Sequence, residues 1–199
     1  MLTLCIDTAY KYLTCALIND EQILASVSLP CFKKQSEELF VVLKQVFDDA
    51  HIERNAIDSI CISEGPGSYT GVRIAMSLAK TIGEVLPVDV YTISTLRLYA
   101  AGNPSTMVIM NARANRAYVG VFNNNEVVLE DYISGISEID PKNYKIMGDG
   151  SLVNHEDNFG DIPTAFLKTK SVWNKVDKIA YLVPKYLKES ESYLKWLKH

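Results

Sequence analysis

Residues 65–73 have the sequence GPGSYTGVR and follow a short apolar run that is typical of a buried strand. Three glycines and a proline before a helical pattern predict a tight turn whose backbone N–H groups lie at a helix N-terminus. Such a turn can bind an anion such as a phosphate, or it can let another backbone approach closely. The choice between these two uses decides whether the protein is an enzyme.

This turn differs from the common phosphate-binding and nucleophile motifs. A Walker A loop ends in Gly-Lys-Ser/Thr, whereas valine and arginine follow Gly71. A dinucleotide-binding fingerprint needs a glycine where Thr70 stands, and a nucleophile elbow needs one where Pro66 stands. The local pattern therefore favours a structural turn from strand to helix, with Ser68 or Thr70 as the N-cap.

Histidine and cysteine, the other residue types that often do chemistry, are sparse. The three histidines and four cysteines include no His pair four residues apart and no CxxC pair, so we expect no metal site. A nucleophile paired with a distant histidine stays open, although no local signature supports one. We expect Cys5, Cys15, Cys31 and Cys61 to be small buried hydrophobes in a reducing cytoplasm.

The composition is that of an ordinary globular protein. Of 199 residues, 48% are apolar and 22% charged, and the length suffices to bury a core. No apolar run approaches the length of a membrane-spanning helix. Asp7 and Lys11 interrupt the N-terminal stretch where a signal peptide would be apolar. We therefore expect a cytoplasmic protein without a membrane partner.

The charge is unevenly distributed along the chain. Residues 165–199 hold eight lysines and three acidic residues, a net charge of +5, which leaves −9 for the remainder of a total of −4. Aromatic residues alternate with these lysines, as in segments that bind nucleic acid. A solvated amphipathic C-terminal helix explains the same pattern without a ligand, and we favour it because charge alone identifies no partner.

The first half of the chain predicts three strands, a helix, a strand, a helix, a strand and a short helix. In order, these elements cover residues 2–6, 12–18, 22–29, 36–51, 59–63, 70–86, 88–93 and 95–101. Ser36 is the expected N-cap of the helix over 36–51. Pro87 is expected to end the helix over 70–86.

A similar order then begins again in the second half. It comprises strands at 107–110, 118–122 and 127–132, a helical patch at 137–143, a strand at 144–147 and helical spacing after Trp173 that Pro184 interrupts. Two such units, the second shortened, describe the duplicated βββαβα architecture of actin-like and sugar-kinase-like α/β proteins. We predict two domains, residues 1–102 and 103–199, that meet near Gly102-Asn103-Pro104.

In a fold of this type, two hairpin turns and the cleft between the halves hold ATP and a metal ion. Asp7 could bind a metal-linked water and Thr8 a phosphate, but no glycine lets this turn curl around a phosphate. The corresponding position in the second half is Asn111, which removes one of two carboxylates that would favour a divalent cation. Asp7 equally suits a brace for the hairpin. We do not expect this chain alone to hydrolyse ATP.

The two longer helices carry more apolar surface than one core requires. Apolar residues of the helix over 70–86 spread over about 200° of its circumference, and about half that arc suffices to face a core. In the helix over 36–51, Val41 and Val42 lie outside the main stripe. This excess predicts a second buried face, as at a subunit interface. The alternative is that one domain encloses both helices.

The residues described above resemble the TsaB (YeaZ) family, which takes part in forming threonylcarbamoyladenosine on tRNA. The resemblance is carried by GPGSYTGVRIAMSLAK and supported by LCIDTA, QSEELF and MNARANRAYVGVF, which together span about residues 1–122. The matching motif positions are Asp7, Ser36, Gly65, Pro66, Gly67, Ser68, Thr70, Gly71 and Arg73. Three positions depart from the family pattern: Gln35 replaces a histidine, Ala75 a glycine and Asn111 an aspartate.

The resemblance implies an actin-like pseudoenzyme that supports a transferase subunit, TsaD, rather than the glycoprotease that older descriptions name. It implies that the helices over 36–51 and 70–86 bind TsaD, that the ATPase TsaE joins the complex, and that homodimers form. No cofactor is expected on this chain alone, and binding of ATP or ADP at the joint interface stays open. By position, we expect the partner interface to contain Glu38, Val42, Gln45, Arg73, Met76 and Lys80.

Two other functions stay open at this point. The chain could be an ATP-dependent small-molecule kinase of the actin-like class that uses Asp7 and the turn over 65–71. Alternatively, its lysine- and aromatic-rich C-terminal segment could bind tRNA directly. We favour the non-catalytic subunit, with tRNA contacted only indirectly, because the helix pair is apolar and the cleft is poorly equipped.

Overall fold

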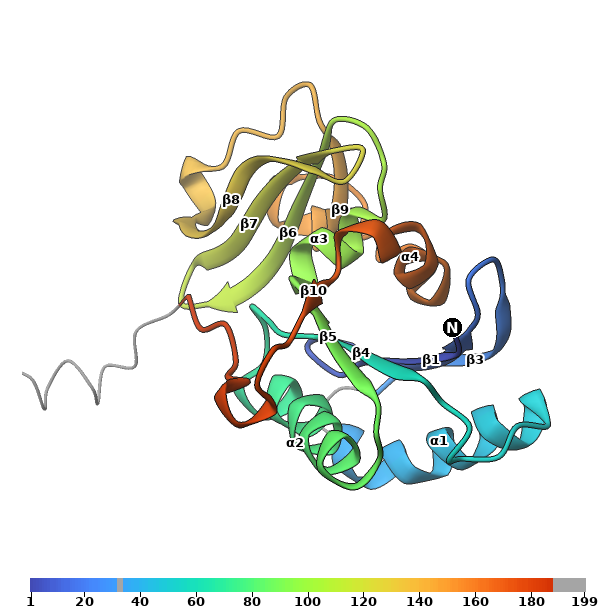
Figure 1. Ribbon diagram of the computed structural model, residues 1–199. Coiled ribbons are helices and arrows are strands. Elements are labelled where there is room, and N and C mark those ends of the chain that lie inside the picture. Colours follow the sequence, from blue (N-terminus) through green and yellow to red (C-terminus); the bar gives the residue numbers. More distant parts are fainter. Residues whose placement is uncertain (32–33, 188–199) are drawn as a thin grey trace, which may run out of the picture.

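A computed structural model of the chain describes residues 1–31 and 34–187. These residues form two β-sheets with helices on both faces of the first sheet (Figure 1). The strand order is β10-β5-β4-β1-β2-β3 in the six-stranded sheet and β8-β7-β6-β9 in the four-stranded sheet. Within the described ranges, no helix combines the length and the apolar character that crossing a bilayer requires.

The first sheet begins with an antiparallel meander and continues through parallel strands. The meander consists of β1 (Thr3–Asp7), β2 (Tyr12–Ile18) and β3 (Ile23–Pro30). On the other side of β1 lie the parallel strands β4 (Ser59–Ser63) and β5 (Asp89–Ile93). Strands β1 and β4 are buried at every residue, because helices cover both faces of the sheet.

Helices α1 (Gln35–Ala50) and α2 (Tyr69–Val85) cover the lower face of this sheet in Figure 1. Helices α3 (Thr95–Ala100) and α4 (Ile162–Lys168) lie on its other face, toward the second sheet. The cysteines are confirmed as buried free thiols. Two of them, Cys5 and Cys61, belong to the core around α3, and burial raises their pKa well above the usual value.

The second sheet contains β6 (Thr106–Arg113), β7 (Arg116–Asn123), β8 (Glu126–Gly135) and β9 (Lys145–Gly148). Its antiparallel meander β6-β7-β8 and the parallel pair β6-β9 repeat the start of the first sheet. The predicted duplicated fold with a shortened second half is therefore confirmed. The helix expected over 137–143 is wrong: a 3-10 turn at Ile136–Glu138 stands there, and Asn143 has a left-handed φ of 69°.

The segment after Trp173 also differs from the sequence expectation. Its described part is no α-helix: β10 (Asn174–Lys175) pairs with β5, and a 3-10 turn follows at Ile179–Tyr181. This segment extends because it satisfies the free edge of β5, where the Val176 N–H donates to the Val90 carbonyl at 2.8 Å. The rest of the predicted helical pattern, residues 188–199, lies outside the described residues.

The remaining differences are small. Helix α1 begins one residue before Ser36, and its N-cap is Lys34, which makes no side-chain cap bond. Helix α4 is absent from the sequence expectation. The predicted domain boundary near residue 102 stays a prediction, although β10 joins the sheet of the first half.

Candidate functional site

The glycine-rich turn between β4 and α2 packs against the turn that follows β1. A Cβ atom on Gly67 would lie closer than 3.0 Å to the Ala9 carbonyl oxygen, and one on Gly71 equally close to that of Thr8. The Ser68 N–H donates to the Ala9 carbonyl at 2.7 Å. Of the two uses that the sequence allowed, anion binding and close backbone contact, Gly67 and Gly71 therefore serve close contact with another backbone.

Side chains of both turns complete this junction. The Thr8 hydroxyl donates to the Gly71 carbonyl at 2.6 Å and accepts the Ala75 N–H at 3.3 Å, so it does not present itself to a phosphate. Ser68 is confirmed as the N-cap of α2, since its hydroxyl accepts the Gly71 N–H at 3.3 Å. Thr70, the other cap candidate, is exposed in the first turn of the helix.

The start of the motif is fixed to α3. The Gly65 N–H donates to the Thr95 hydroxyl at 3.1 Å, and the Thr95 N–H donates to the Gly65 carbonyl at 2.9 Å. Pro66 is buried beside it. The motif thus joins β4, α2 and α3 into one rigid unit.

Asp7 is fully buried at the end of β1, and all its hydrogen-bond partners are internal. Its carboxylate accepts the Ser63 hydroxyl at 2.5 Å, the Ala9 N–H at 3.0 Å and the Tyr99 hydroxyl at 2.8 Å. Burial raises the pKa of this carboxyl, and the three hydrogen bonds lower it in part. This arrangement makes Asp7 a brace that ties β1 to β4 and α3.

Where the two hairpin turns face each other, side chains fill the space. The Tyr10 hydroxyl and the Lys11 ammonium both bind the buried carboxylate of Asp149, which follows β9. Asp149 also accepts the backbone N–H of Asn111 at 2.7 Å. Burial and the adjacent Asp149 raise the pKa of Tyr10. The ring of Phe159 packs against Tyr10, with centroids 6.1 Å apart.

Sequence reasoning missed Asp149, because its role depends on contact between turns that are distant in the chain. The only local signal is its place between two glycines directly after a strand. In the part of the chain that the structure describes, no group of three or more His, Cys, Asp or Glu is arranged as metal ligands would be.

A groove of about 520 Å³ lies between α1 and α2 and takes all its lining residues from these two helices. Two large apolar side chains in it are exposed, Phe40 at 67% and Tyr69 at 63%. The other lining residues are Ser36, Leu39, Thr70, Arg73, Ile74, Ser77, Leu78 and Thr81. This helix pair therefore exposes apolar side chains, two of them in the groove, whereas the second buried face at a subunit interface stays a prediction.

Two residues expected at the partner interface are placed elsewhere. Val42 and Met76 are 3% and 4% exposed and belong to the chain's own core, so this expectation is wrong for both. The expectation for Val42 failed because the sequence pattern does not fix how α1 is rotated about its axis. Leu39, Val42 and Val46 face the sheet, and Phe40 therefore points outward.

The other expected interface residues lie at or near the surface. Gln45 and Arg73 are exposed, whereas Glu38 and Lys80 are half-buried. Of these, only Arg73 lines the groove, together with the motif residues Ser36 and Thr70. Phe40 and Tyr69 were missed, although both stand inside the motif stretches QSEELF and GPGSYTG.

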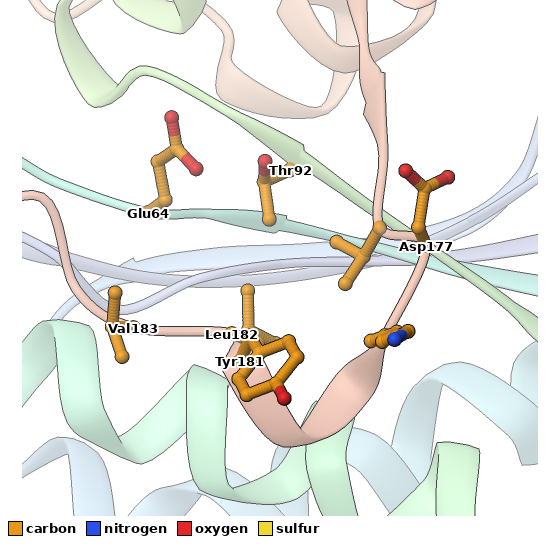
Figure 2. Close-up of a pocket in the computed structure, with 8 residues that line it drawn as sticks. Glu64, Thr92, Asp177, Tyr181, Leu182 and Val183 are labelled. Atoms are coloured by element: carbon orange, nitrogen blue, oxygen red, sulfur yellow. The ribbon is translucent and has the colours of Figure 1, made fainter.

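A second cavity, of about 510 Å³, lies beside the ends of β4 and β5 and is framed by residues 176–183 (Figure 2). The Glu64 and Asp177 carboxylates stand on either side of the Thr92 hydroxyl, and Tyr181, Leu182 and Val183 form the opposite wall. This cavity takes no residue from the α1–α2 groove.

The family model described as "TsaD: tRNA N6-adenosine threonylcarbamoyltransferase" matches residues 30–140, more than half of the chain. The chain belongs to this family. Its matched region contains the groove, the glycine-rich turn and Asn111, but not Asp7 or Asp149.

Relatives within the family are named TsaB, which confirms the resemblance seen in the sequence. The chain is 26% identical to the Bacillus subtilis "tRNA threonylcarbamoyladenosine biosynthesis protein TsaB", over 99% of this chain and 98% of that protein. It is 27% identical to the Escherichia coli protein of the same name, over 63% and 57% of the two chains.

The solved structure of YeaZ from Pseudomonas aeruginosa has the same fold. It superposes with a TM-score of 0.77 at 19% identity, over 94% of this chain and 99% of that one. A second Pseudomonas aeruginosa structure, described as similar to the peptidase YEAZ, superposes with a TM-score of 0.75.

Proposed function

We propose that this chain is a non-catalytic subunit in the biosynthesis of threonylcarbamoyladenosine on tRNA. It binds a TsaD-type transferase subunit on the α1–α2 face and thereby supports the activity of that subunit. Relatives from Bacillus subtilis and Escherichia coli carry the name of this biosynthesis, and the matching family model describes the transferase. Because tRNA is the substrate, we place the complex in the cytoplasm.

The observation that carries this proposal is the exposed aromatic pair in the groove. About two thirds of the surface of Phe40 and of Tyr69 is exposed to water, although both side chains line an apolar groove between two helices. Aromatic side chains of this kind are typical anchors of protein interfaces, where partner atoms replace water. Arg73 at the edge of the groove supplies a polar rim.

The contacts in the cleft support the absence of catalysis in this chain. A metal-binding role for Asp7 would require its carboxylate oxygens, which accept three internal hydrogen bonds. A phosphate beside Thr8 would compete with the bonds to α2. Tyr10, Lys11 and Asp149 occupy the space between the turns.

The same contacts support a proposal about cofactors and further partners. This chain alone binds no nucleotide, and ATP or ADP binds at the interface with the TsaD-type subunit, which supplies the missing ligands. A TsaE-type ATPase joins that complex. Free protein forms homodimers through the same apolar face, and tRNA contacts the chain only through the complex.

Co-purification with the TsaD-type subunit of the same organism tests the interface. Phe40→Glu places a charge in the centre of the groove and is expected to weaken the complex at least tenfold. The control is Val128→Glu, because Val128 is 59% exposed on β8 of the other sheet. An undiminished complex with Phe40→Glu contradicts the proposed interface.

An activity assay and a binding measurement test the non-catalytic role of this chain. The reconstituted tRNA modification is expected to need both subunits, and modification by this chain alone would contradict the non-catalytic role. Calorimetry with Mg-ATP on the isolated chain is expected to show no binding. Tight binding with turnover would support the small-molecule kinase instead.

A further inference from the structure

The cavity of about 510 Å³ lies at the carboxyl ends of two neighbouring parallel strands. Glu64 directly follows β4, and Thr92 is the penultimate residue of β5. From these strands the chain leaves to opposite faces of the sheet, because β4 leads into α2 and β5 into α3 (Figure 1). Adjacent strands whose connections diverge in this way leave a crevice beyond their carboxyl ends, which is where open α/β sheets bind ligands.

The outer wall of the cavity is a loop, residues 176–183, that other elements hold in place. At its start, the Val176 N–H donates to the Val90 carbonyl at 2.8 Å. Just past its end, the Lys185 N–H donates to the Glu64 carbonyl, also at 2.8 Å. A 3-10 turn shapes the middle of the loop. The wall is therefore formed in advance, so a ligand has little ordering of the loop to bring about.

Thr92 places a hydroxyl without a protein partner in this cavity. The residue is only 3% exposed, and no hydrogen bond to its hydroxyl comes from any residue that the structure describes. Figure 2 shows this hydroxyl between the carboxylates of Glu64 and Asp177. A buried hydroxyl that lacks a hydrogen bond costs free energy, and only water or a ligand in the cavity can supply the bond here.

The two carboxylates beside this hydroxyl are not paired with cations of the described chain. None of the ion pairs among the described residues includes Glu64 or Asp177. Lys175 is only two residues before Asp177, but its ammonium binds the carboxylate of Asp89 at 2.7 Å. The Glu64 and Asp177 carboxylates are therefore available to a ligand.

An aromatic ring and aliphatic side chains make up most of the remaining lining. Tyr181 and Val183 are 74% and 67% exposed, and Val176 and Leu182 extend the apolar wall. Lys178 is the only cation among the described lining residues, and its ammonium lies 5.7 Å from the centroid of the Tyr181 ring. With two carboxylates and one ammonium, the lining is negative overall and has an apolar side.

These groups together select an organic cation. An alkyl ammonium group has three N–H donors, which suit the Thr92 hydroxyl and the carboxylates on either side of it. A carbon chain attached to it suits the apolar wall. A metal ion is disfavoured, because the described residues contain no group of three or more His, Cys, Asp or Glu that could hold one. An anion is disfavoured by the negative lining.

We propose that this cavity binds an aliphatic primary amine. Its ammonium lies between Glu64 and Asp177 and donates to the Thr92 hydroxyl, and its carbon chain packs against Tyr181. The ammonium belongs to a free diamine or to a lysine side chain of another protein, which present the same chemistry. Binding needs no partner subunit and is independent of the function proposed above.

Amide NMR signals of the free full-length chain test this proposal. Titration with 1,4-diaminobutane and with N-acetyl-lysine amide, at constant ionic strength, is expected to shift the signals of Glu64, Thr92 and residues 176–183 in a saturable way. The tighter of the two ligands identifies the source of the ammonium. Butan-1-ol, which has the carbon chain without the charge, is the control and should not saturate. Failure of both amines to saturate, or shifts confined to other residues, overturns the proposal.

Two variants remove single acceptors from the cavity. Thr92→Val keeps the shape of the side chain and is expected to weaken amine binding about fivefold without lowering stability in urea unfolding, because the hydroxyl has no partner in the described chain. Glu64→Gln is expected to weaken binding by about the same factor. The control is Glu130→Gln, the same change at an exposed position of β8. Affinity that Glu64→Gln leaves unchanged, or that Glu130→Gln lowers equally, overturns the proposal.

Lys178→Gln tests the sign of the ligand's charge. Because this variant removes the cation from the lining, we expect it to bind the amine about threefold more tightly than the natural protein does. Urea unfolding confirms that the variant is folded. Weaker amine binding by Lys178→Gln would show that the ammonium does not lie beside the carboxylates, and it overturns the proposal.

Discussion

The carbonyl of Thr8 and the α-carbon of Gly71 are in backbone-to-backbone contact, which joins the turn after β1 to the start of α2. A Cβ atom on Gly71 would lie closer than 3.0 Å to the Thr8 oxygen. The hydroxyl of Thr8 closes the same contact from the other side by donating to the Gly71 carbonyl. The motif GPGSYTG therefore positions α2, and with it one wall of the groove.

Gly71→Ala tests this contact, because the sign of its effect on the free energy of unfolding depends on whether the turn is open or packed. In an open helix, alanine in place of glycine stabilises by about 1 kcal/mol. Here the added methyl group meets backbone atoms, so we expect destabilisation of about 3 kcal/mol in urea unfolding. Gly135→Ala is the control, since its methyl group would meet only the flexible side chain of Glu138. A more stable Gly71→Ala protein would show that the turn is open.

The buried carboxyl of Asp7 predicts an unusual dependence of stability on pH. Its pKa is raised above the usual 3.8, so the folded state holds the proton more tightly than the unfolded state does. The stability that Asp7 contributes is therefore fully present below pH 3.8 and decreases as pH rises through the folded pKa.

Asp7→Asn removes this titration. The free energy of unfolding of the variant, measured relative to the natural protein, is expected to rise with pH from 3.8 up to the raised pKa. Denaturant titrations at several pH values measure it, with the exposed Asp49→Asn as the control. A difference that is constant or falls with pH contradicts a raised pKa.

Removal of the Asp149 carboxylate is expected to loosen the junction between the two hairpin turns. Asp149→Ala deprives the Tyr10 hydroxyl, the Lys11 ammonium and the Asn111 N–H of their acceptor. We expect a loss of about 3 kcal/mol in urea unfolding. The exposed pair of Lys44 and Asp48 supplies the control, because Asp48→Ala should leave stability nearly unchanged. Equal effects of both variants would contradict a structural role for Asp149.

Buried and exposed residues of the helix pair should respond differently to truncation. Met76→Ala leaves a cavity in the core and is expected to cost about 2–5 kcal/mol in thermal or urea unfolding. Phe40→Ala removes an exposed side chain and should leave stability nearly unchanged while weakening the complex. A complex that tolerates Phe40→Ala but is lost in a fully folded Met76→Ala protein would reverse this assignment.

Most of the fold follows from local sequence patterns. Branched residues in short runs predict β1, β2 and β4, and long apolar periodicity predicts α1 and α2 to within a residue or two. The pattern failed for short elements: α4 has only seven residues, and β10 forms because the edge of β5 needs a partner. Neither cause is visible in a window of ten residues.

The candidate site was predicted less well, for a related reason. The excess apolar arc predicts that α1 and α2 have a second face, but a wide arc does not show which part faces the sheet. For this reason the prediction that Val42 lies at the surface is wrong. Phe40 is the α1 residue that is exposed there instead. The partnership of Tyr10 with Asp149 depends on tertiary contact alone.

The pairing of β10 with β5 has a consequence for synthesis of the protein. The β5 edge of the six-stranded sheet is paired with Asn174 and Lys175, which leave the ribosome after all the other strands of that sheet. Until then, a nascent chain exposes an unpaired strand edge, and a fragment that stops before residue 174 keeps that edge permanently. The β5 edge is therefore protected from edge-to-edge aggregation only after Asn174 and Lys175 have been synthesised.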